Sequence, residues 1–233
     1  MVKLREDEFL MYVEEIVQVL ASLFEESKDV AKLMYKILAS GKDMISFEDI
    51  LFLAGKVVSD ESLKKELAEE TVLSMYWWRM LLPVRMKHVK CLSWENRLLL
   101  SDINEMFEIP SCIRYAFEGL CMRGTWDYEY SVYRYFSQIK EPYKNLILHV
   151  VNGLIEKTIS NYYVTATSIR EECKRQKFPS SRVGILIAEL KGGGFISPLV
   201  FTPLPKILRL KEEPLYELNK ALFALKLQVF NVD

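Results

Sequence analysis

Residues 179–197 read PSSRVGILIAELKGGGFIS, and this stretch decides which fold the sequence predicts. Pro179 can open a helix, because its fixed φ suits the first helical turn. One apolar helix face follows, formed by Val183, Leu186, Ile187 and Leu190. The glycines at 192–194 can end the helix, because glycine readily adopts the left-handed backbone found at helix C-termini. The stretch therefore predicts a short, mostly apolar helix with an abrupt end.

The residues on either side of this helix complete a larger pattern. Before it, residues 161–178 predict an extended piece, a helix that carries Ile169 and Cys173, and a turn. After it, FISPLVF at 195–201 and KILRL at 206–210 favour strands, and the prolines between them restrict a hairpin to a sheet edge. The order helix, turn, helix, hairpin resembles the winged-helix fold, with the hairpin as its wing. The resemblance covers about residues 145–212.

A second, looser copy of the helix-turn-helix is predicted within residues 91–140. Ser101 can cap a short helix that bears Ile103 and Phe107, and Gly124 can close a second helix after a turn. That second helix has its apolar face at Ile113, Ala116, Phe117 and Leu120. The following segment TWDYEYSVYRYF fits either a wing strand or an aromatic helix.

The first ninety residues are expected to be helical. Apolar spacing predicts helices over 9–23 and 30–38, and Ser46 is placed to cap a third, with Asp49 at capping-box distance. A fourth helix begins near residue 59 and ends before Pro83. Its expected core residues are Leu63, Leu67, Val72, Met75, Trp77 and Trp78.

The predicted fold class is thus mostly α. Residues 1–90 form a helical domain that could also be a degenerate winged helix, residues 91–140 form a helix-turn-helix unit, and residues 141–233 form a winged-helix domain with an apolar C-terminal helix. In that last helix, residues stepping three and four apart make a heptad seam. The seam consists of Leu215, Leu218, Leu222, Leu225 and Val229. We expect it to contact a second copy of the chain in a homodimer, or else to be covered by the N-terminal helices.

Charge is unevenly distributed along the chain. Residues 1–139 have a net charge of −6 and residues 140–233 a net charge of +5, and the span 157–211 alone carries +7. This pattern favours a basic face that binds duplex DNA; the alternative is that acidic and basic surfaces attract each other across a domain boundary.

The winged-helix resemblance implies where DNA would bind, since the second helix of the motif enters the major groove. The predicted contacts are Arg170, Lys174, Arg175, Lys177, Ser180, Ser181, Arg182, Lys206, Arg209 and Lys211, with Ser111, Arg114 and Tyr115 in the second unit. Only Arg182 on the outward helix face is a strong base reader. The other residues on the outward face of this helix are Gly184, Ile185, Ala188 and Glu189.

Two functions therefore fit the sequence. The first, which the net charge of +7 over 157–211 favours, is a DNA-binding protein, a transcriptional regulator that works as a dimer. The second is a protein-interaction module of tandem winged helices, as in chromosome-organising and transcription assemblies of that architecture, in which Ile185 and Ala188 contact a partner.

The sequence gives little support for phosphate binding, catalysis or metal binding. The glycines at 192–194 follow a helix, whereas a phosphate-binding loop precedes one. SQIK at 137–140 lacks the companion motifs of Ser-x-x-Lys enzymes, and His88 with Cys91 lacks a second pair at zinc spacing. We expect no enzyme, no cofactor and no metal. Scattered cysteines, and the lack of a signal peptide or membrane span, predict a cytoplasmic protein, and scarce glutamine hints at a thermophile.

Overall fold

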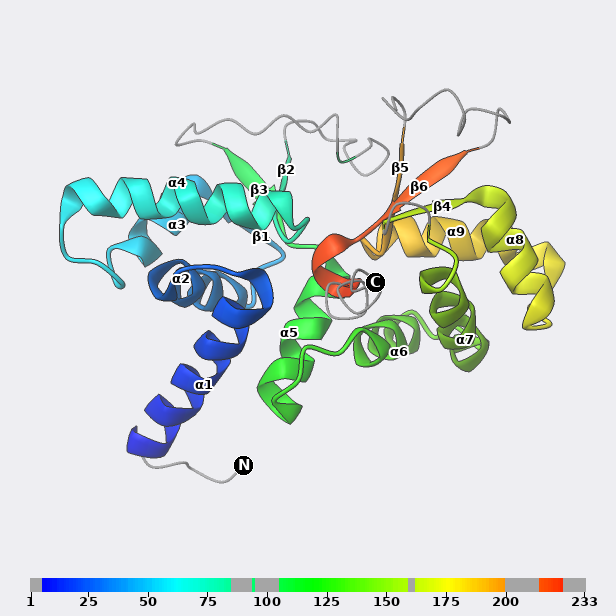
Figure 1. Ribbon diagram of the computed structural model, residues 1–233, viewed down its shortest axis with the longest axis horizontal. Helices are drawn as coiled ribbons and strands as arrows, with labels where there is room; N and C mark the ends of the chain where they lie inside the picture. The colour runs from blue at the N-terminus through cyan, green and yellow to red at the C-terminus, as the bar shows by residue number, and fades with distance from the viewer. Residues whose placement is uncertain (1–5, 85–93, 95–104, 159–161, 200–213, 224–233) are drawn as a thin grey trace, which may run out of the picture.

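The computed structural model describes residues 6–84, 94, 105–158, 162–199 and 214–223 (Figure 1). Its helices are α1 (Glu6–Phe24), α2 (Lys28–Ala39), α3 (Phe47–Ala54), α4 (Glu61–Trp77), α5 (Ser111–Arg123), α6 (Tyr128–Gln138), α7 (Lys144–Ile155), α8 (Ala166–Arg175), the 3-10 turn η3 (Ser180–Arg182) and α9 (Val183–Gly192). Its strands are β1 (Met44–Ser46), β2 (Leu82–Pro83), β3 (Met106–Glu108), β4 (Tyr163–Thr165), β5 (Ile196–Pro198) and β6 (Leu215–Leu218). The chain is mostly helical, as predicted, with small antiparallel sheets.

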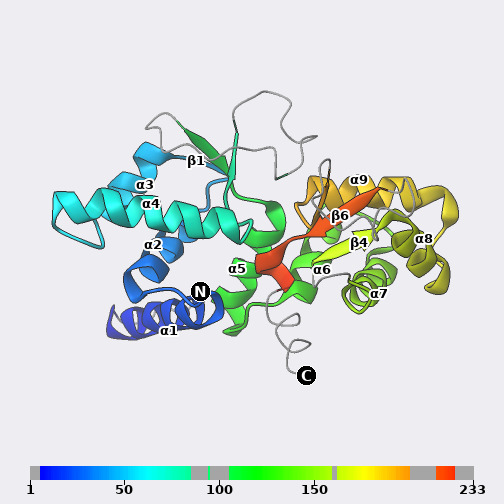
Figure 2. The same cartoon turned by 45° about the horizontal axis from the view of Figure 1, so that its top comes forward.

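The same order of elements occurs twice. The N-repeat, residues 28–108, runs α2, β1, α3, α4, β2, β3, and the C-repeat, residues 144–218, runs α7, β4, α8, α9, β5, β6. Both sheets are antiparallel and place the last strand in the middle, with the orders β1-β3-β2 and β4-β6-β5. Figure 1 shows the N-repeat on the left, the C-repeat on the right, and α5 and α6 between and below them; the turned view in Figure 2 also shows α5 between the two repeats.

In both repeats, the first strand leads directly into a capped helix. The Ser46 hydroxyl accepts the Asp49 N–H at 3.0 Å, and the Asp49 carboxylate accepts the Ser46 N–H, which confirms the predicted capping box. In the C-repeat, the Thr165 hydroxyl accepts the Ser168 N–H at 3.0 Å. These caps fix the corner between strand and helix, because they satisfy N–H groups that the first helical turn leaves unbonded.

The predicted helix-turn-helix at 91–140 needs correction. Phe107 lies in β3 and not in a helix, and it pairs with Ile45 of β1 and Pro83 of β2. The counterpart of the C-repeat is therefore residues 28–108. The second predicted helix does exist as α5, which ends at Gly124 with a left-handed φ of 72°. The segment left open as strand or helix forms α6.

The C-terminal predictions are also corrected. Leu215 and Leu218 lie in β6, between β4 and β5, and not on a heptad helix. Pairing on both edges of β6 satisfies its backbone groups, and this outweighs the helical spacing of its leucines. Strand β5 pairs with β6, so residues 195–198 find their partner at 215–218. The proposed partner strand at 206–210, like Leu225 and Val229, lies outside the described residues.

A buried polar network joins the two repeats where α4 and α9 end. Asn219 is fully buried, and its side-chain amide donates to the carbonyl oxygens of Arg79 and Gly194 at 3.1 Å each. These two residues hold equivalent left-handed positions after α4 and α9, with φ of 63° and 77°. One side chain thus satisfies a carbonyl at each helix C-terminus, where no intrahelical donor remains. The repeats are fixed against each other at this point.

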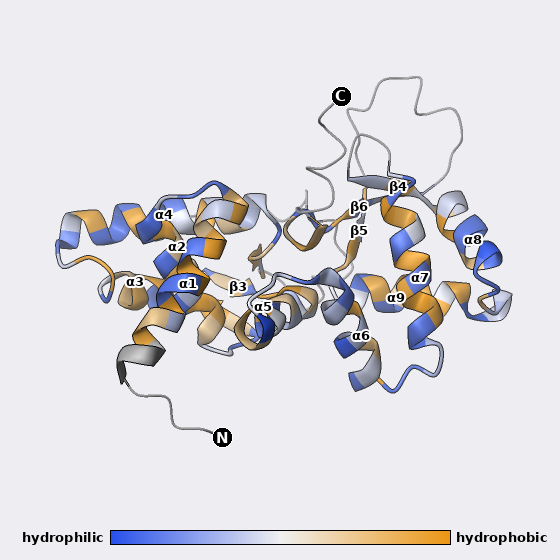
Figure 3. Ribbon diagram, turned by 60° about the horizontal axis from the view of Figure 1, so that its bottom comes forward, coloured by the Kyte–Doolittle hydropathy of each residue, from blue (hydrophilic) through white to orange (hydrophobic). Residues whose placement is uncertain are grey.

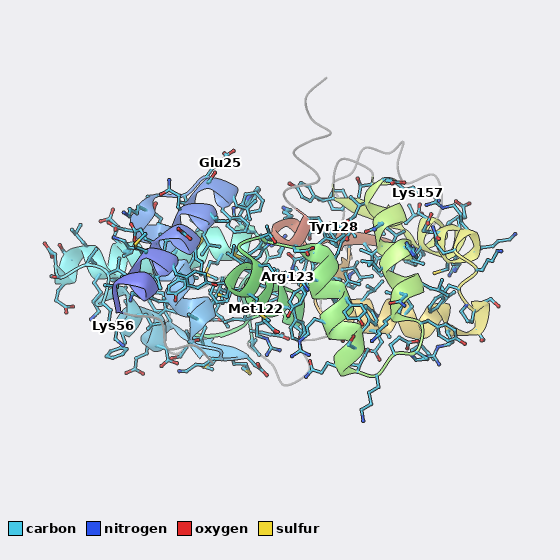
Figure 4. All side chains as sticks on the ribbon, turned by 90° about the horizontal axis from the view of Figure 1, so that it is seen from below. Glu25, Lys56, Met122, Arg123, Tyr128 and Lys157 are labelled. Carbon is cyan, nitrogen blue, oxygen red and sulfur yellow. The ribbon has the colours of Figure 1, made fainter. Side chains whose placement is uncertain are left out.

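Two further contacts reinforce this junction. The Arg79 guanidinium pairs with the buried carboxylate of Glu217, with Nε 3.2 Å from Oε1. The Trp126 indole N–H donates to the Ala221 carbonyl at 2.9 Å, which ties the segment before α6 to the helical residues 220–223. Figure 4 shows Tyr128 beside that helix, where its ring lies 5.6 Å from the ring of Phe223.

Helix α6 ends on a strained residue, which gives a first prediction. Lys140 has a φ of 56°, and the next N–H, that of Glu141, reaches back to Phe136 O at 2.9 Å. A left-handed backbone costs a residue with a Cβ about 1–2 kcal/mol, and glycine avoids that cost. We expect Lys140→Gly to raise the free energy of unfolding by about 0.5–1 kcal/mol, measured by urea denaturation. Glu70→Gly, inside α4, should lower it by about 1 kcal/mol; a loss at both positions would contradict the prediction.

Candidate interaction surfaces

The outward face of α9 is small and apolar. Gly184, Ile185 and Ala188 are exposed, as predicted, and Ile185 is 47% exposed. The fourth outward residue, Glu189, is half-buried, and its carboxylate accepts the Tyr135 hydroxyl at 3.3 Å. In Figure 3, α9 is drawn mainly in hydrophobic colours and the neighbouring α8 mainly in hydrophilic ones. The helix that resembles a recognition helix therefore presents few groups that hydrogen-bond to base edges.

Arg182, the predicted base reader, is engaged within the chain. Its Nη2 lies 2.6 Å from Oε2 of Glu141, and its guanidinium lies over the Tyr143 ring at 5.5 Å. Glu141 is only 9% exposed, so the pair is partly shielded from solvent. Contact with a base would require this ion pair to break. The adjacent Ser180 and Ser181 are exposed in η3.

The other predicted DNA contacts divide into three groups. Arg170, Lys174 and Lys177 are exposed on α8 and the turn after it, and form no ion pair among the described residues. Arg175 instead pairs with the buried Glu172, with Nη2 2.8 Å from Oε1. The remaining three predicted contacts lie outside the described residues: Lys206, Arg209 and Lys211.

Glu172 is a structural carboxylate. Its side chain is fully buried and also meets Lys157, 3.1 Å away, which Figure 4 labels beside α7. Burial acts to raise the pKa of Glu172, but hydrogen bonds from Arg175, Gln176 and Lys157 hold that pKa below its ordinary value. The carboxylate is therefore charged, and it neutralises part of the basic stretch from within.

The residues predicted to read DNA from α5 also serve internal contacts. Arg114 pairs with Asp43, and its Nη2 donates to the Ser111 hydroxyl at 3.0 Å. Tyr115 is half-buried, with the Arg134 guanidinium 5.8 Å from its ring centre. Helix α5 is thus held against the N-repeat, and these residues do not form an open reading surface.

The predicted oligomer contacts are corrected in the same way. Leu218 and Leu222 are each 2% exposed and belong to the core of their own chain, and Leu215 is half-buried in β6. Leu218 and Leu222 are therefore covered within their own chain and are not free to contact a second copy. The remaining members of the seam, Leu225 and Val229, are outside the described residues.

Sequence reasoning missed the most distinctive exposed face, which lies on α4. Its residues step three, four, three and four apart, and all are exposed: Leu63, Glu66, Glu70, Leu73 and Trp77. We call this set the α4 stripe. Leu63 and Trp77 had been expected in the core, but they are 49% and 63% exposed. The residues that pack inward on α4 also have helical spacing, so periodicity alone could not tell the buried face of the helix from the exposed one. The buried face consists of Leu67, Ala68, Thr71, Val72 and Met75.

Two further features of the described residues concern small ligands and metals. An open groove of about 480 Å³ lies between α1 and the turn after α5, and no titratable side chain lines it. Within the described ranges, no three His, Cys, Asp or Glu side chains lie close enough to hold a metal ion. None of the helices described is long and apolar enough to cross a membrane.

These features define a mostly helical protein with two similar helix-and-sheet repeats and exposed helix faces. A protein-family model matches residues 14–228, so the chain belongs to that family. The match carries no statement of activity or ligand. No curated protein and no solved structure was found to match the chain.

Proposed function

We propose that this chain is a protein-interaction module built from two winged-helix units. Each repeat has the order helix, strand, helix, helix, strand, strand, with the last strand central in its sheet. This arrangement supports a winged-helix assignment for both repeats, with α4 and α9 as the second helices of their helix-turn-helix motifs. Residues 85–93, 95–104 and 200–213, where the wings would fall, are outside the described residues.

The residues on the outward faces of α4 and α9 favour a protein partner over DNA. A DNA-reading helix needs side chains that hydrogen-bond to bases and cations that neutralise phosphates. The α4 stripe instead presents Glu66 and Glu70, which would repel a phosphate backbone. On α9, Ile185 and Ala188 present apolar surface. Exposed apolar side chains on a rigid helix are typical of protein–protein contacts.

Duplex DNA binding is the second candidate, and one observation favours it. Arg170, Lys174 and Lys177 form an exposed basic cluster on one side of the C-repeat, with no ion pair among the described residues. Three phosphate contacts would give log–log salt dependence with a slope of about −2.7. Such binding would have little sequence preference, because phosphate contacts position a protein without reading bases.

Titration of the full chain with a random-sequence duplex at several salt concentrations separates the two functions. Under the proposed function we expect a Kd no tighter than about 10⁻⁴ M at physiological salt, the weak end of non-specific binding. Micromolar binding with a steep salt slope, lost in the double variant Lys174→Glu with Lys177→Glu but kept in Lys65→Glu, would establish the DNA function instead.

The protein function has a direct test of its own. A photo-crosslinking amino acid in place of Ile185 should give one discrete protein adduct in cells that naturally produce the chain. The same group in place of Tyr133, 43% exposed on α6, is the matched control and should give none. Equal labelling from both positions would argue against a partner on α9.

A further inference from the structure

The α4 stripe has the geometry of one side of a helix–helix contact. Its five residues repeat with the alternating spacing of a heptad seam, and the last lies fourteen positions after the first, from Leu63 to Trp77. That span corresponds to about 21 Å along the helix axis. The opposite face of α4 packs on α2 and α3, so the stripe points away from the core.

The apolar members of the stripe are too exposed to be explained by the chain's own packing. Leu73 is 59% exposed and Trp77 is 63% exposed. Trp77 adjoins the junction between the repeats, and the Lys220 Nζ lies 4.3 Å from its ring centre. This contact holds the indole in place while most of it remains open to solvent. A fixed, exposed aromatic beside a leucine is a typical anchor of a protein interface.

The two acidic members of the stripe specify the charge of the partner. Glu61 and Glu69, the other acids of α4, pair with Lys64 and Lys65 of the same helix. Glu66 and Glu70 form no ion pair among the described residues, and they lie between Leu63 and Leu73 in the stripe. A partner that covers the leucines must also cover these carboxylates. Burying them without cations would be strongly unfavourable.

We propose that α4 binds a basic amphipathic helix of another protein. Apolar side chains of that helix pack on Leu63, Leu73 and Trp77, and two lysines or arginines lie opposite Glu66 and Glu70. This inference rests on the proposed protein-interaction function and names the partner's chemistry. A helix fits better than a strand, because only a helix repeats its contacts at alternating three- and four-residue spacing.

Two exposed surfaces of a second copy of this chain are poor matches for the stripe. Its exposed basic cluster on α8 and the turn after it, Arg170, Lys174 and Lys177, contains no large apolar side chain. Its exposed apolar residues on α1, Leu10 and Met11, are followed by Glu14 and Glu15, which would meet the acids of the stripe with like charge. Neither surface combines the two properties that the stripe requires.

Designed peptides test this inference on the full chain. The probe is a 21-residue helical peptide whose single stripe reads Leu, Lys, Lys, Leu, Leu at the same spacing, made in this order and in reverse. The control peptides carry Glu in place of both Lys. By fluorescence anisotropy, we expect at least one Lys peptide to bind at least tenfold more tightly than its Glu counterpart. The double variant Glu66→Lys with Glu70→Lys should reverse that preference.

A second variant tests whether charges of α4 outside the stripe affect the binding. Exchanging the neighbouring pair, as Lys65→Glu with Glu69→Lys, keeps the net charge and leaves the stripe intact. It should change the affinity for the Lys peptide by less than twofold. Because all these positions are on the helix surface, circular dichroism should show that every variant remains folded.

Three outcomes would overturn the inference: no binding of either Lys peptide, equal binding of Lys and Glu peptides, or self-association of the chain that the Glu66→Lys, Glu70→Lys variant abolishes. The third would make a second copy the occupant. Failure here is distinguishable from failure of the proposed function. If the crosslinker at Ile185 still captures a protein, the module binds a partner, but not a basic helix on α4.

Discussion

Replacing Glu217 by glutamine is expected to lower the free energy of unfolding by about 3–5 kcal/mol, the usual cost of breaking a buried ion pair. Glu217 is 1% exposed and accepts hydrogen bonds from Arg79, whose Nε and Nη2 lie 3.2 and 3.4 Å from its two oxygens. Lys220 lies 3.6 Å from the same carboxylate. The variant leaves the Arg79 guanidinium without this counter-charge, at the point where the repeats join. Urea denaturation followed by far-UV circular dichroism measures the change.

The matched control is an exposed ion pair on α4. Glu61 lies 3.3 Å from Lys64, and its side chain is 85% exposed. Glu61→Gln should change the stability by less than about 0.5 kcal/mol, because solvent screens such a pair. If Glu217→Gln proved as mild as Glu61→Gln, the Arg79 guanidinium would have an alternative partner or access to water, and the buried network would not be what joins the repeats.

Gly194→Ala is expected to be comparably disruptive, by about 2–5 kcal/mol. Gly194 has a left-handed φ of 77°, and a Cβ there would lie 2.5 Å from the Cβ of Pro110. The backbone conformation accounts for about 1–2 kcal/mol and overpacking for a further 1–3 kcal/mol. The packing term arises because the Gly194 carbonyl already accepts from the Cys112 thiol, which brings the start of α5 against the end of α9.

Gly184→Ala, on α9 itself, is expected to change the stability in the opposite direction. Gly184 is exposed on α9, and a Cβ there would meet nothing within 4 Å. Alanine should therefore stabilise the protein by about 0.5–1 kcal/mol, since glycine inside a helix costs that much in chain entropy. Thermal unfolding of the two variants gives the comparison directly. Equal effects of the two substitutions would mean that α5 does not pack against the glycine turn.

Local signals in the sequence were sufficient for most helices. Apolar spacing predicted α1, α2, α8 and α9, and the capping box at Ser46 placed the start of α3. Gly124 ended α5 as expected. These features depend on residues within about one or two turns of each other, so they can be read without knowing the fold.

Strands β1, β2, β3 and β6 could not be read in this way, whereas the strand predicted within 195–201 is present as β5 and the extended piece before α8 as β4. Ile45 pairs with Phe107, and Thr165 pairs with Leu215, so each three- or four-residue strand depends on a partner far along the chain. A strand this short shows no alternation that distinguishes it from a helical segment. Phe107 and Leu218 are predicted in helices for that reason, and the second copy is placed at 91–140, with a degenerate winged helix in residues 1–90 only as an alternative.

Neighbouring residues alone predict a mostly helical chain, the apolar outward face of α9 and the glycine end of that helix. Which side chains remain free depends on the tertiary structure. Arg182 meets Glu141 across 41 positions and Asn219 meets Arg79 across 140, while Trp77 is left exposed on the α4 stripe. Availability for binding depends on contacts between distant segments, and folding alone brings those segments together.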